Sequence, residues 1–288
     1  MKKLAKSSVT KPIFVVGAGH SGTSLLARAI SEEPSITSWD ENNKTWIWGN
    51  AFNKNDLLTA DDLTPQIKKH ITKRFTQYVN KSGGKRVCDK TPKNCLRIPF
   101  ILSVFPDAKI IHIVRDGRAV ISSTQSRIND KSYSLWKHLQ VKLKGSSVMD
   151  WYVFLPRIFF VIKKVLGLPT NYWGSKPQGW EDWSEDDYNV KLAKQWSQTV
   201  SVASDRGREF AHQNYLEIHY EDLIDSPTET IRKVAQFAEI EDPQAIIDFC
   251  ESKIDPSRNQ KRIKNLSKDD TQEIMTIIQP TLLKLGYE

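Results

Sequence analysis

The sequence predicts an α/β fold in which a mainly parallel, doubly wound sheet is flanked by helices. Residues 13–16 form a continuous apolar run that suits a strand buried on both faces. A glycine-rich turn follows at 17–22, and apolar residues then recur at helical spacing from Leu25 to Ile30. A second buried strand is predicted at 109–114, and a second helical pattern follows it. Strands and helices that alternate in this way are typical of open α/β sheets.

The turn between the first strand and the first helix has the chemistry of an anion site. Glycines let the backbone wrap an anion, and the helix N-terminus offers unpaired N–H groups and a positive dipole end. The spacing Gly17-x4-Gly22-Thr23-Ser24 is almost that of a nucleoside-triphosphatase loop, but Thr23 stands where the lysine should be. Because that lysine reaches the β- and γ-phosphates, its absence argues against ATP or GTP chemistry with magnesium. A P-loop nucleotide kinase or ATPase is kept as the alternative.

The remaining elements can be placed in chain order. Residues 34–38 indicate a short strand, after which Asp40 and Glu41 would lie at the carboxyl end of the sheet, where ligands bind. We expect helical structure over 45–82 with a helix start at Thr64-Pro65, and a capping box at Ser226-Pro-Thr-Glu229. Further strands are predicted at 86–89 and 215–220, and further helices at 94–105, 189–210, 226–238, from 242 onward, and at the C-terminus after a basic loop at 257–268.

Residues 129–190 differ in character from the rest, because they are rich in Trp and Tyr and broken by Gly and Pro. We interpret them as a helical lid inserted into a single domain that spans residues 1–288. Within the lid, Arg157, Lys163 and Lys164 lie among apolar residues. Two interpretations of this stretch stay open, an ordinary helix packed on the core and a peripheral contact with a membrane.

Composition and charge argue against several classes of protein. The formal net charge of +8 favours an anionic partner, and its dispersal along the chain argues against nucleic acid. Cys88, Cys95 and Cys250 include no Cys-x2-Cys pair, so we expect neither a disulfide framework nor a zinc site. We identify no secretory signal, and residues 151–168, the longest apolar stretch, are interrupted by proline and basic residues. These features predict a soluble, cytoplasmic protein.

Four motifs then appear in order along the chain. Arg115 ends the second buried strand and Ser123 lies eight residues on, and an arginine fork with a hydroxyl suits a terminal phosphate monoester. The motifs are Gly19-His-Ser-Gly-Thr-Ser24, Asp89-Lys-Thr-Pro92, Val114-Arg-Asp-Gly-Arg-Ala-Val-Ile-Ser-Ser123 with Arg127, and Tyr220-Glu-Asp-Leu223. On these residues the chain resembles the sulfotransferases that use 3′-phosphoadenosine-5′-phosphosulfate (PAPS). It is most similar to the branch with tyrosylprotein sulfotransferases and bacterial carbohydrate and small-molecule enzymes.

The resemblance implies a set of donor-binding residues. It implies that His20, Ser21, Gly22, Thr23 and Ser24 wrap the 5′-phosphosulfate. It assigns the 3′-phosphate to Arg115 and Ser123, and further nucleotide contacts to Arg127 and Tyr220. Ser257, Arg258 and Lys261 resemble the segment that closes over the donor, with a solvated basic loop as the alternative.

The resemblance also implies catalytic roles. Glu41 falls where the tyrosylprotein enzymes carry their catalytic glutamate, and Asp40 is its rival. His20 departs from the family pattern, since relatives carry Arg or Lys there, but a neutral imidazole still donates a hydrogen bond. Lys90 is then the surest cation near the leaving phosphate. Sulfuryl transfer needs an acceptor oxygen in line, a base and positive charge at the leaving oxygen, and no metal.

The expected reaction is transfer of the sulfuryl group from PAPS to an acceptor hydroxyl or amine, releasing adenosine 3′,5′-bisphosphate. The expected acceptor is a carbohydrate, a glycolipid or another small molecule, with protein tyrosine as an alternative within the family. The lid and residues 41–60 would set that specificity. A module that binds the bisphosphate without catalysis is a third hypothesis.

Overall fold

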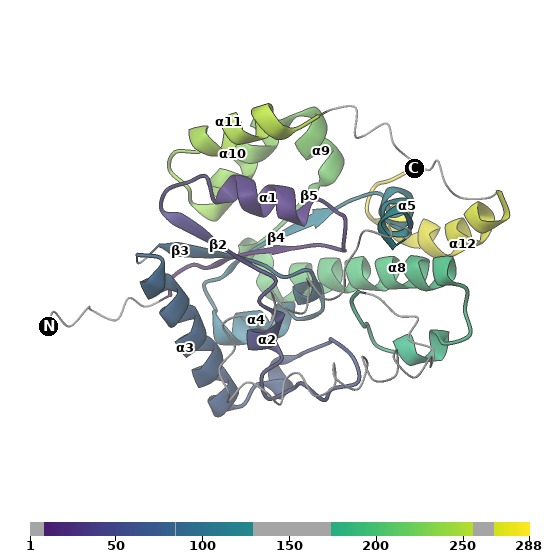
Figure 1. Ribbon diagram of the computed structural model, residues 1–288, viewed down its shortest axis with the longest axis horizontal. Coiled ribbons are helices and arrows are strands. Elements are labelled where there is room, and N and C mark those ends of the chain that lie inside the picture. The colour runs from purple at the N-terminus through teal and green to yellow at the C-terminus, as the bar shows by residue number, and fades with distance from the viewer. Residues whose placement is uncertain (1–8, 84, 129–173, 256–267) are drawn as a thin grey trace, which may run out of the picture.

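The computed structural model describes residues 9–83, 85–128, 174–255 and 268–288 (Figure 1). Its centre is a five-stranded sheet in the order β2-β3-β1-β4-β5. The strands are β1 (Ile13–Val16), β2 (Ile36–Asp40), β3 (Arg86–Lys90), β4 (Lys109–Val114) and β5 (Tyr215–His219). Each neighbouring pair is parallel. The carboxyl ends of all five strands therefore meet at one edge of the sheet, and the predicted α/β class with a parallel sheet is confirmed.

One face of the sheet is covered by helices that share a core with alternate strand residues. These helices are α1 (Thr23–Ile30), α9 (Tyr220–Asp225), α10 (Pro227–Ala238) and α11 (Gln244–Lys253) (Figure 1). Ile13 and Val15 of β1 point into this core, whereas Phe14 and Val16 point to the opposite face. Successive strand side chains alternate between faces, so β1 is buried on both sides.

The opposite face is covered by α2 (Asn43–Trp46), α3 (Pro65–Lys81), α4 (Ile98–Val104) and α8 (Tyr188–Arg206). Its centre is aromatic: the ring centroids of Trp46 and Phe75 lie 5.3 Å apart, and those of Phe75 and Phe105 lie 4.8 Å apart. A third cluster joins α5 (Gly117–Ile128), α8 and α12 (Lys268–Lys284) beyond the end of β4. The two layers of helices hold the strand ends, and hence the candidate site, in fixed positions.

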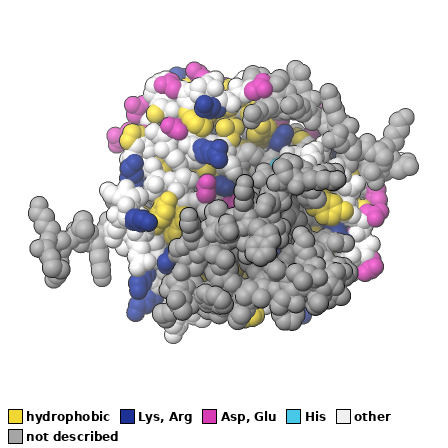
Figure 2. Space-filling model, in the orientation of Figure 1, with side chains coloured by type: hydrophobic (Ala, Val, Ile, Leu, Met, Phe, Trp, Pro, Cys, Tyr) yellow, Lys and Arg dark blue, Asp and Glu magenta, His cyan; other side chains and the backbone are white. Residues whose placement is uncertain are grey.

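The outward face of α3 is basic. This helix carries Lys68, Lys69, Lys73, Arg74 and Lys81 and no acidic residue. Figure 2 shows Lys and Arg side chains along the edge of the molecule where α3 lies in Figure 1, while acidic side chains lie mainly elsewhere on that face. The positive charge of the chain is therefore partly gathered on one helix, although the sequence shows it as dispersed.

Most predicted elements are confirmed, with shifts that have local causes. β1 and β4 have the predicted bounds, whereas β2 begins at Ile36, two residues later than predicted. The expected helical stretch over 45–82 is wrong as one element, since α2, a 3-10 turn (η1, Ala60–Asp62) and α3 share it. Thr64 does begin α3, because its Oγ1 accepts the N–H of Ile67 at 3.3 Å.

Two other helix predictions need correction. The helix predicted over 94–105 breaks at Arg97, between the 3-10 turn η2 (Pro92–Leu96) and α4. The expected capping box at Ser226 is also wrong, because the Ser226 side chain makes no cap hydrogen bond, although α10 does begin at Pro227. At the break, the Arg97 backbone is not helical, with φ at −134°, and its side chain contacts Asp56 and Asn43.

Much of the predicted lid lies outside the described residues. Only its C-terminal part, from residue 174, can be described, and it contains the 3-10 turn η4 (Trp180–Trp183) before α8 begins. The amphipathic stretch at 151–168 and the basic loop with Ser257, Arg258 and Lys261 are also outside them. Among the described helices, none has the length and apolar character needed to cross a membrane.

Candidate active site

The predicted anion site is the loop after β1 together with the first turn of α1. Gly22 caps α1 with φ at 90°, and a Cβ atom there would lie 2.4 Å from Cδ2 of Tyr220. Glycine is therefore required on both conformational and steric grounds. The first turn of α1 contains no acidic side chain, so the positive end of the helix is not neutralised by its own residues. Ser21 Oγ is buried and has no hydrogen-bond partner within the described part of the chain.

Arg115, Ser123 and Tyr220 converge on this loop from three other segments. Arg115 Nη1 donates to the carbonyl oxygen of His20 at 2.9 Å, and Ser123 Oγ lies 3.3 Å from His20 Nδ1. The Arg115 guanidinium carbon lies 4.3 Å from the centroid of the Tyr220 ring, a cation–π contact. The buried Arg115 Nε also lacks a partner among the described residues. The predicted pair of Arg115 and Ser123 is thus brought together around His20.

Two unpartnered polar atoms and an open helix end fit an anionic ligand. A buried polar atom without a partner costs free energy, so such atoms in a cleft mark positions that a ligand can satisfy. Ser21 Oγ offers a hydroxyl and Arg115 Nε a charged donor. These hydrogen-bonding groups suit a phosphate, for which arginine and backbone N–H groups are the usual partners.

Glu41 and Lys90 meet at the neighbouring strand ends. Glu41 Oε1 lies 3.8 Å from Lys90 Nζ, and the Glu41 side chain is 51% exposed whereas that of Lys90 is 6% exposed. The Glu41 N–H donates to the Lys90 carbonyl oxygen at 2.8 Å, which extends the β2–β3 pairing by one bond. Asp40, the rival base, is exposed and accepts from Ser38 Oγ at 3.2 Å. The carboxylate in contact with Lys90 is therefore that of Glu41.

Both Glu41 and His20 adopt left-handed backbone conformations, with φ at 48° and 65°. Such conformations cost non-glycine residues about 1 to 3 kcal/mol and occur preferentially at functional sites. Glu41 directly follows the edge strand β2, and His20 lies in the loop after the central strand β1. Five described non-glycine residues have positive φ, and two of them, Glu41 and His20, are predicted catalytic residues.

Asp89 lies beneath Lys90 and is fully buried. Its carboxylate accepts from Trp46 Nε1 at 3.1 Å and from Asn94 Nδ2 at 3.2 Å. Burial raises the pKa of Asp89 to about 6, and the hydrogen bond from Trp46 opposes that rise. The contacts tie the end of β3 to α2 and η2, so Asp89 holds the backbone from which Lys90 projects. In the motif Asp89-Lys-Thr-Pro92, the role of Asp89 is therefore to hold the backbone in place.

Other predicted residues remain predictions. Arg127 lies in α5, but its side chain is outside the described set, as are Ser257, Arg258 and Lys261 entirely. Within the described residues, no group of three or more His, Cys, Asp or Glu side chains is arranged to hold a metal ion. Thr23 is buried and Ser24 exposed at the start of α1.

Sequence reasoning missed Asp56 and Arg97, which form a buried ion pair, and Arg97 also contacts Asn43, two positions after Glu41. Neither belongs to a motif, and a single acidic residue in a loop carries no periodic signal. A surface pocket of about 450 Å³ lies farther along this side, against α8, and is lined by Leu57, Leu96, Pro177, Gln178, Ser197, Gln198, Ser201, Val202, Asp205 and Arg206. It contains none of the predicted site residues, so we place the site by its converging polar groups.

Comparison with known proteins identifies the family. A sequence model of the Sulfotransferase family matches residues 12–159 and 163–244. Protein-tyrosine sulfotransferase 1 of Danio rerio is 21% identical over 306 residues, which cover 96% of this chain and 72% of that protein. The chain spans only 51% of the length of a protein-tyrosine sulfotransferase of Drosophila melanogaster.

Solved structures show the same fold at low identity. The sulfotransferase domain from the curacin biosynthetic pathway has a TM-score of 0.55 at 15% identity and covers 98% of this chain and 99% of that one. Mouse sulfotransferase SULT7A1, crystallised with adenosine 3′,5′-bisphosphate (PAP), has a TM-score of 0.51 at 15% identity and covers 95% of this chain and 85% of that one. The family match, which includes the loop after β1 and all the described strands, establishes that the chain belongs to the sulfotransferase family and is a transferase of sulfo groups.

Proposed function

We propose that the protein transfers the sulfuryl group from PAPS to an acceptor hydroxyl or amine and releases adenosine 3′,5′-bisphosphate. The observation that carries this proposal is the convergence of Arg115 and Ser123 on His20 at the open end of α1. The structure of the mouse relative with PAP supports the choice of donor. The whole chain is proposed to act as a single sulfotransferase domain.

PAPS carries phosphate at its 5′ and 3′ positions, and the site offers one group of hydrogen-bonding residues for each. The N–H groups of residues 20–24 and Ser21 Oγ would bind the 5′-phosphosulfate at the start of α1. Arg115 and Ser123 would hold the 3′-phosphate, and Tyr220 would fix the Arg115 guanidinium by stacking against it. Arg127, Ser257, Arg258 and Lys261 are proposed as further donor contacts.

The acceptor side supplies the proton chemistry. Glu41 would take the acceptor proton as the acceptor oxygen or nitrogen bonds to sulfur. The bond between sulfur and the 5′-phosphate oxygen breaks with its electron pair on that oxygen, where Lys90 and His20 would stabilise the negative charge. The 3.8 Å contact between Glu41 Oε1 and Lys90 Nζ supports this division of roles between the two residues.

The acceptor class is proposed as a carbohydrate, a glycolipid or another small molecule. Protein tyrosine is the alternative, and the names of the curated relatives favour it. A P-loop kinase or ATPase is disfavoured because Thr23 replaces the loop lysine. A pure bisphosphate-binding module is disfavoured because Glu41 and Lys90 are paired at the strand ends.

Two measurements test the proposal. Calorimetry should show that adenosine 3′,5′-bisphosphate binds without magnesium, whereas ATP with magnesium should bind far more weakly. Transfer from ³⁵S-labelled PAPS should then be screened against glycans, glycolipids, phenols and tyrosine-containing peptides. Tight binding of ATP with magnesium and none of the bisphosphate would refute the proposed donor, and bisphosphate binding without transfer to any acceptor class would favour the binding module.

A further inference from the structure

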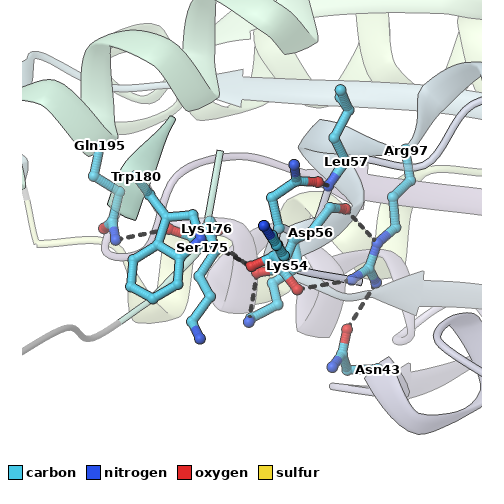
Figure 3. A network of polar contacts seen from close by, with 11 residues as sticks. Asn43, Lys54, Asp56, Leu57, Arg97, Ser175, Lys176, Trp180 and Gln195 are labelled. Carbon is cyan, nitrogen blue, oxygen red and sulfur yellow. Dashed lines mark hydrogen bonds and ion pairs between the residues drawn. The ribbon is translucent and has the colours of Figure 1, made fainter. Parts of the chain in front are cut away.

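A buried ion pair between Arg97 and Asp56 lies at the centre of a polar network (Figure 3). Arg97 Nη2 lies 3.1 Å from Asp56 Oδ1, and Lys93 Nζ lies 2.6 Å from Asp56 Oδ2. The Arg97 side chain is completely buried, and 11% of the Asp56 side chain is exposed. Charges are rarely buried without a partner, so this cluster is built to hold both cations in place.

Arg97 extends the network to the turn that carries Glu41. Its Nη1 donates to Asn43 Oδ1 at 2.7 Å, and its Nε donates to the Asp56 carbonyl oxygen at 3.0 Å. Asn43 is the first residue of α2 and lies two positions after Glu41. The guanidinium therefore fixes the start of α2 through a side-chain contact that backbone pairing does not supply.

Lys93 extends the same network to the segment that follows Lys90 at the end of β3. It lies three positions after Lys90, at the start of η2, and its ammonium group binds the second Asp56 oxygen. Asp56 thus holds both loops at once, one directly through Lys93 and one through Arg97 and Asn43. These two segments directly follow the strand ends at which Glu41 and Lys90 make their 3.8 Å contact.

The network also includes the segment just before α8. Asp56 N–H donates to the Lys176 carbonyl oxygen at 2.7 Å, and Lys176 N–H donates to Asp56 Oδ2 at 2.9 Å. Trp180 Nε1 donates to the Lys54 carbonyl oxygen at 2.8 Å, and Gln195 Nε2 donates to the Ser175 carbonyl oxygen at 2.9 Å. Figure 3 shows these residues grouped around Asp56, although they come from segments more than a hundred positions apart.

The charge of Asp56 is maintained by its surroundings. Burial acts to raise its pKa, but the charges of Lys93 and Arg97, with hydrogen bonds from Lys93 and the Lys176 N–H, hold the pKa below its usual value. Asp56 is therefore ionised at neutral pH. Loss of its charge would leave the buried Arg97 without its counter-ion, which is the costly way to break such a pair.

We propose that Asp56 and Arg97 are positioning residues for the acceptor half of the reaction, which hold Glu41 and Lys90 in register. The inference rests on the proposed function, because it gives Glu41 and Lys90 their roles. Most of the proposed donor contacts stand on other elements, namely the loop after β1 with Arg115, Ser123 and Tyr220, whereas Lys90 would also meet the leaving 5′-phosphate oxygen. Damage to the network should therefore impair proton transfer and acceptor use far more than it weakens donor binding.

The test uses two variants and a matched control. Asp56→Asn removes the central charge, and Asn43→Ala removes only the link to α2 without unbalancing any charge. Asp186→Asn, in the ion pair of Asp186 with Lys194 at 2.6 Å, is the control carboxylate outside the network. Asn43→Ala keeps the proposal testable if Asp56→Asn fails to fold.

Hydrogen–deuterium exchange and steady-state kinetics are measured on all four proteins. In both test variants, exchange at residues 41–46 should rise about tenfold or more, while exchange at 17–24 and bisphosphate affinity stay within about twofold of wild type. With ³⁵S-labelled PAPS and the best acceptor from the screen, kcat/KM for the acceptor should fall about tenfold or more. Unchanged exchange at 41–46, or an equal rise at 17–24 with parallel loss of bisphosphate affinity, would overturn the proposal. If wild type itself transfers no sulfuryl group, the proposed function fails instead, and the positioning proposal with it.

Discussion

The proposed donor side and the proposed acceptor side of the site are built in different ways. On the donor side, the loop after β1 and Arg115 at the end of β4 follow directly from their strands, so short motifs carry both. On the acceptor side, Glu41 and Lys90 are adjacent only because β2 and β3 pair, and the network behind them joins residues 43, 56, 97 and 176. The difference teaches that short motifs can encode the proposed anion site, whereas the position of the proposed base depends on contacts between segments far apart in the sequence.

The largest effect is expected for the base. Glu41→Gln should lower kcat by about 10² to 10⁴, because general base catalysis is typically worth that much. Asp40→Asn is the matched control, since Asp40 is the adjacent acid and its carboxylate contacts Ser38. The measurement is kcat for transfer from labelled PAPS at saturating acceptor. Near-normal turnover of Glu41→Gln would move the base to Asp40 or to a lid histidine such as His138.

The next effect concerns Asp89, whose buried carboxyl group has its pKa raised from 3.8 to about 6. The folded protein keeps this proton where the unfolded chain has lost it, so the associated stability is present below about pH 4 and is lost as the pH rises through 6. Asp89→Asn should remove this loss of stability with rising pH, because asparagine does not titrate. Between pH 4 and pH 7, the free energy of unfolding of the variant should gain on wild type by on the order of 3 kcal/mol.

Denaturant unfolding at several pH values checks this prediction, with the exposed Asp40→Asn as the control. A pH dependence that is the same in Asp89→Asn as in wild type would contradict it. Glu217, in the edge strand β5, should give the opposite pH dependence of stability. Burial acts to raise its pKa, but hydrogen bonds from His112 and Ser204 outweigh burial and hold the pKa well below the usual range. Its contribution to stability is present above the unfolded pKa and is lost as the pH falls.

On the donor side, Arg115→Ala should weaken binding of adenosine 3′,5′-bisphosphate by about 1.5 to 3 kcal/mol, the value of a hydrogen bond to a charged group. Adenosine 5′-phosphate lacks the 3′-phosphate, so its affinity should change much less. Calorimetry with both ligands makes the comparison, and Arg206→Ala in an exposed ion pair is the control. Equal losses for the two ligands would refute the assignment of Arg115 to the 3′-phosphate.

The smallest effect is expected for Gly22→Ala compared with Gly83→Ala. Both glycines have φ between 80° and 90°, but a Cβ at Gly22 would meet the Tyr220 ring at 2.4 Å and one at Gly83 would meet nothing within 4 Å. Both variants therefore suffer the same backbone strain, and only Gly22→Ala also has a clash between its new Cβ and the Tyr220 ring. This clash should add about 1 kcal/mol or more to the loss of stability in Gly22→Ala. Thermal unfolding of the two variants measures the difference, and equal losses would show that the loop can move away from Tyr220.

The sequence predicted what is local and missed what is long-range. The strands at 13–16 and 109–114, the helix start at Thr64 and the donor residues around His20 all follow from short patterns. The break at Arg97 could not be predicted, since nothing adjacent in the chain shows that its guanidinium will bind Asp56 and Asn43. The capping box at Ser226 failed for the converse reason, because a matching pattern does not ensure that the side chain makes the bond.

The separation of the two sides is tested most directly by one quantity, the affinity of Glu41→Gln for adenosine 3′,5′-bisphosphate measured by calorimetry beside Arg115→Ala. If donor binding and proton transfer are built separately, Glu41→Gln should bind the bisphosphate within about twofold of wild type while Arg115→Ala loses about tenfold or more. A loss of bisphosphate affinity in Glu41→Gln as large as that in Arg115→Ala would contradict the account.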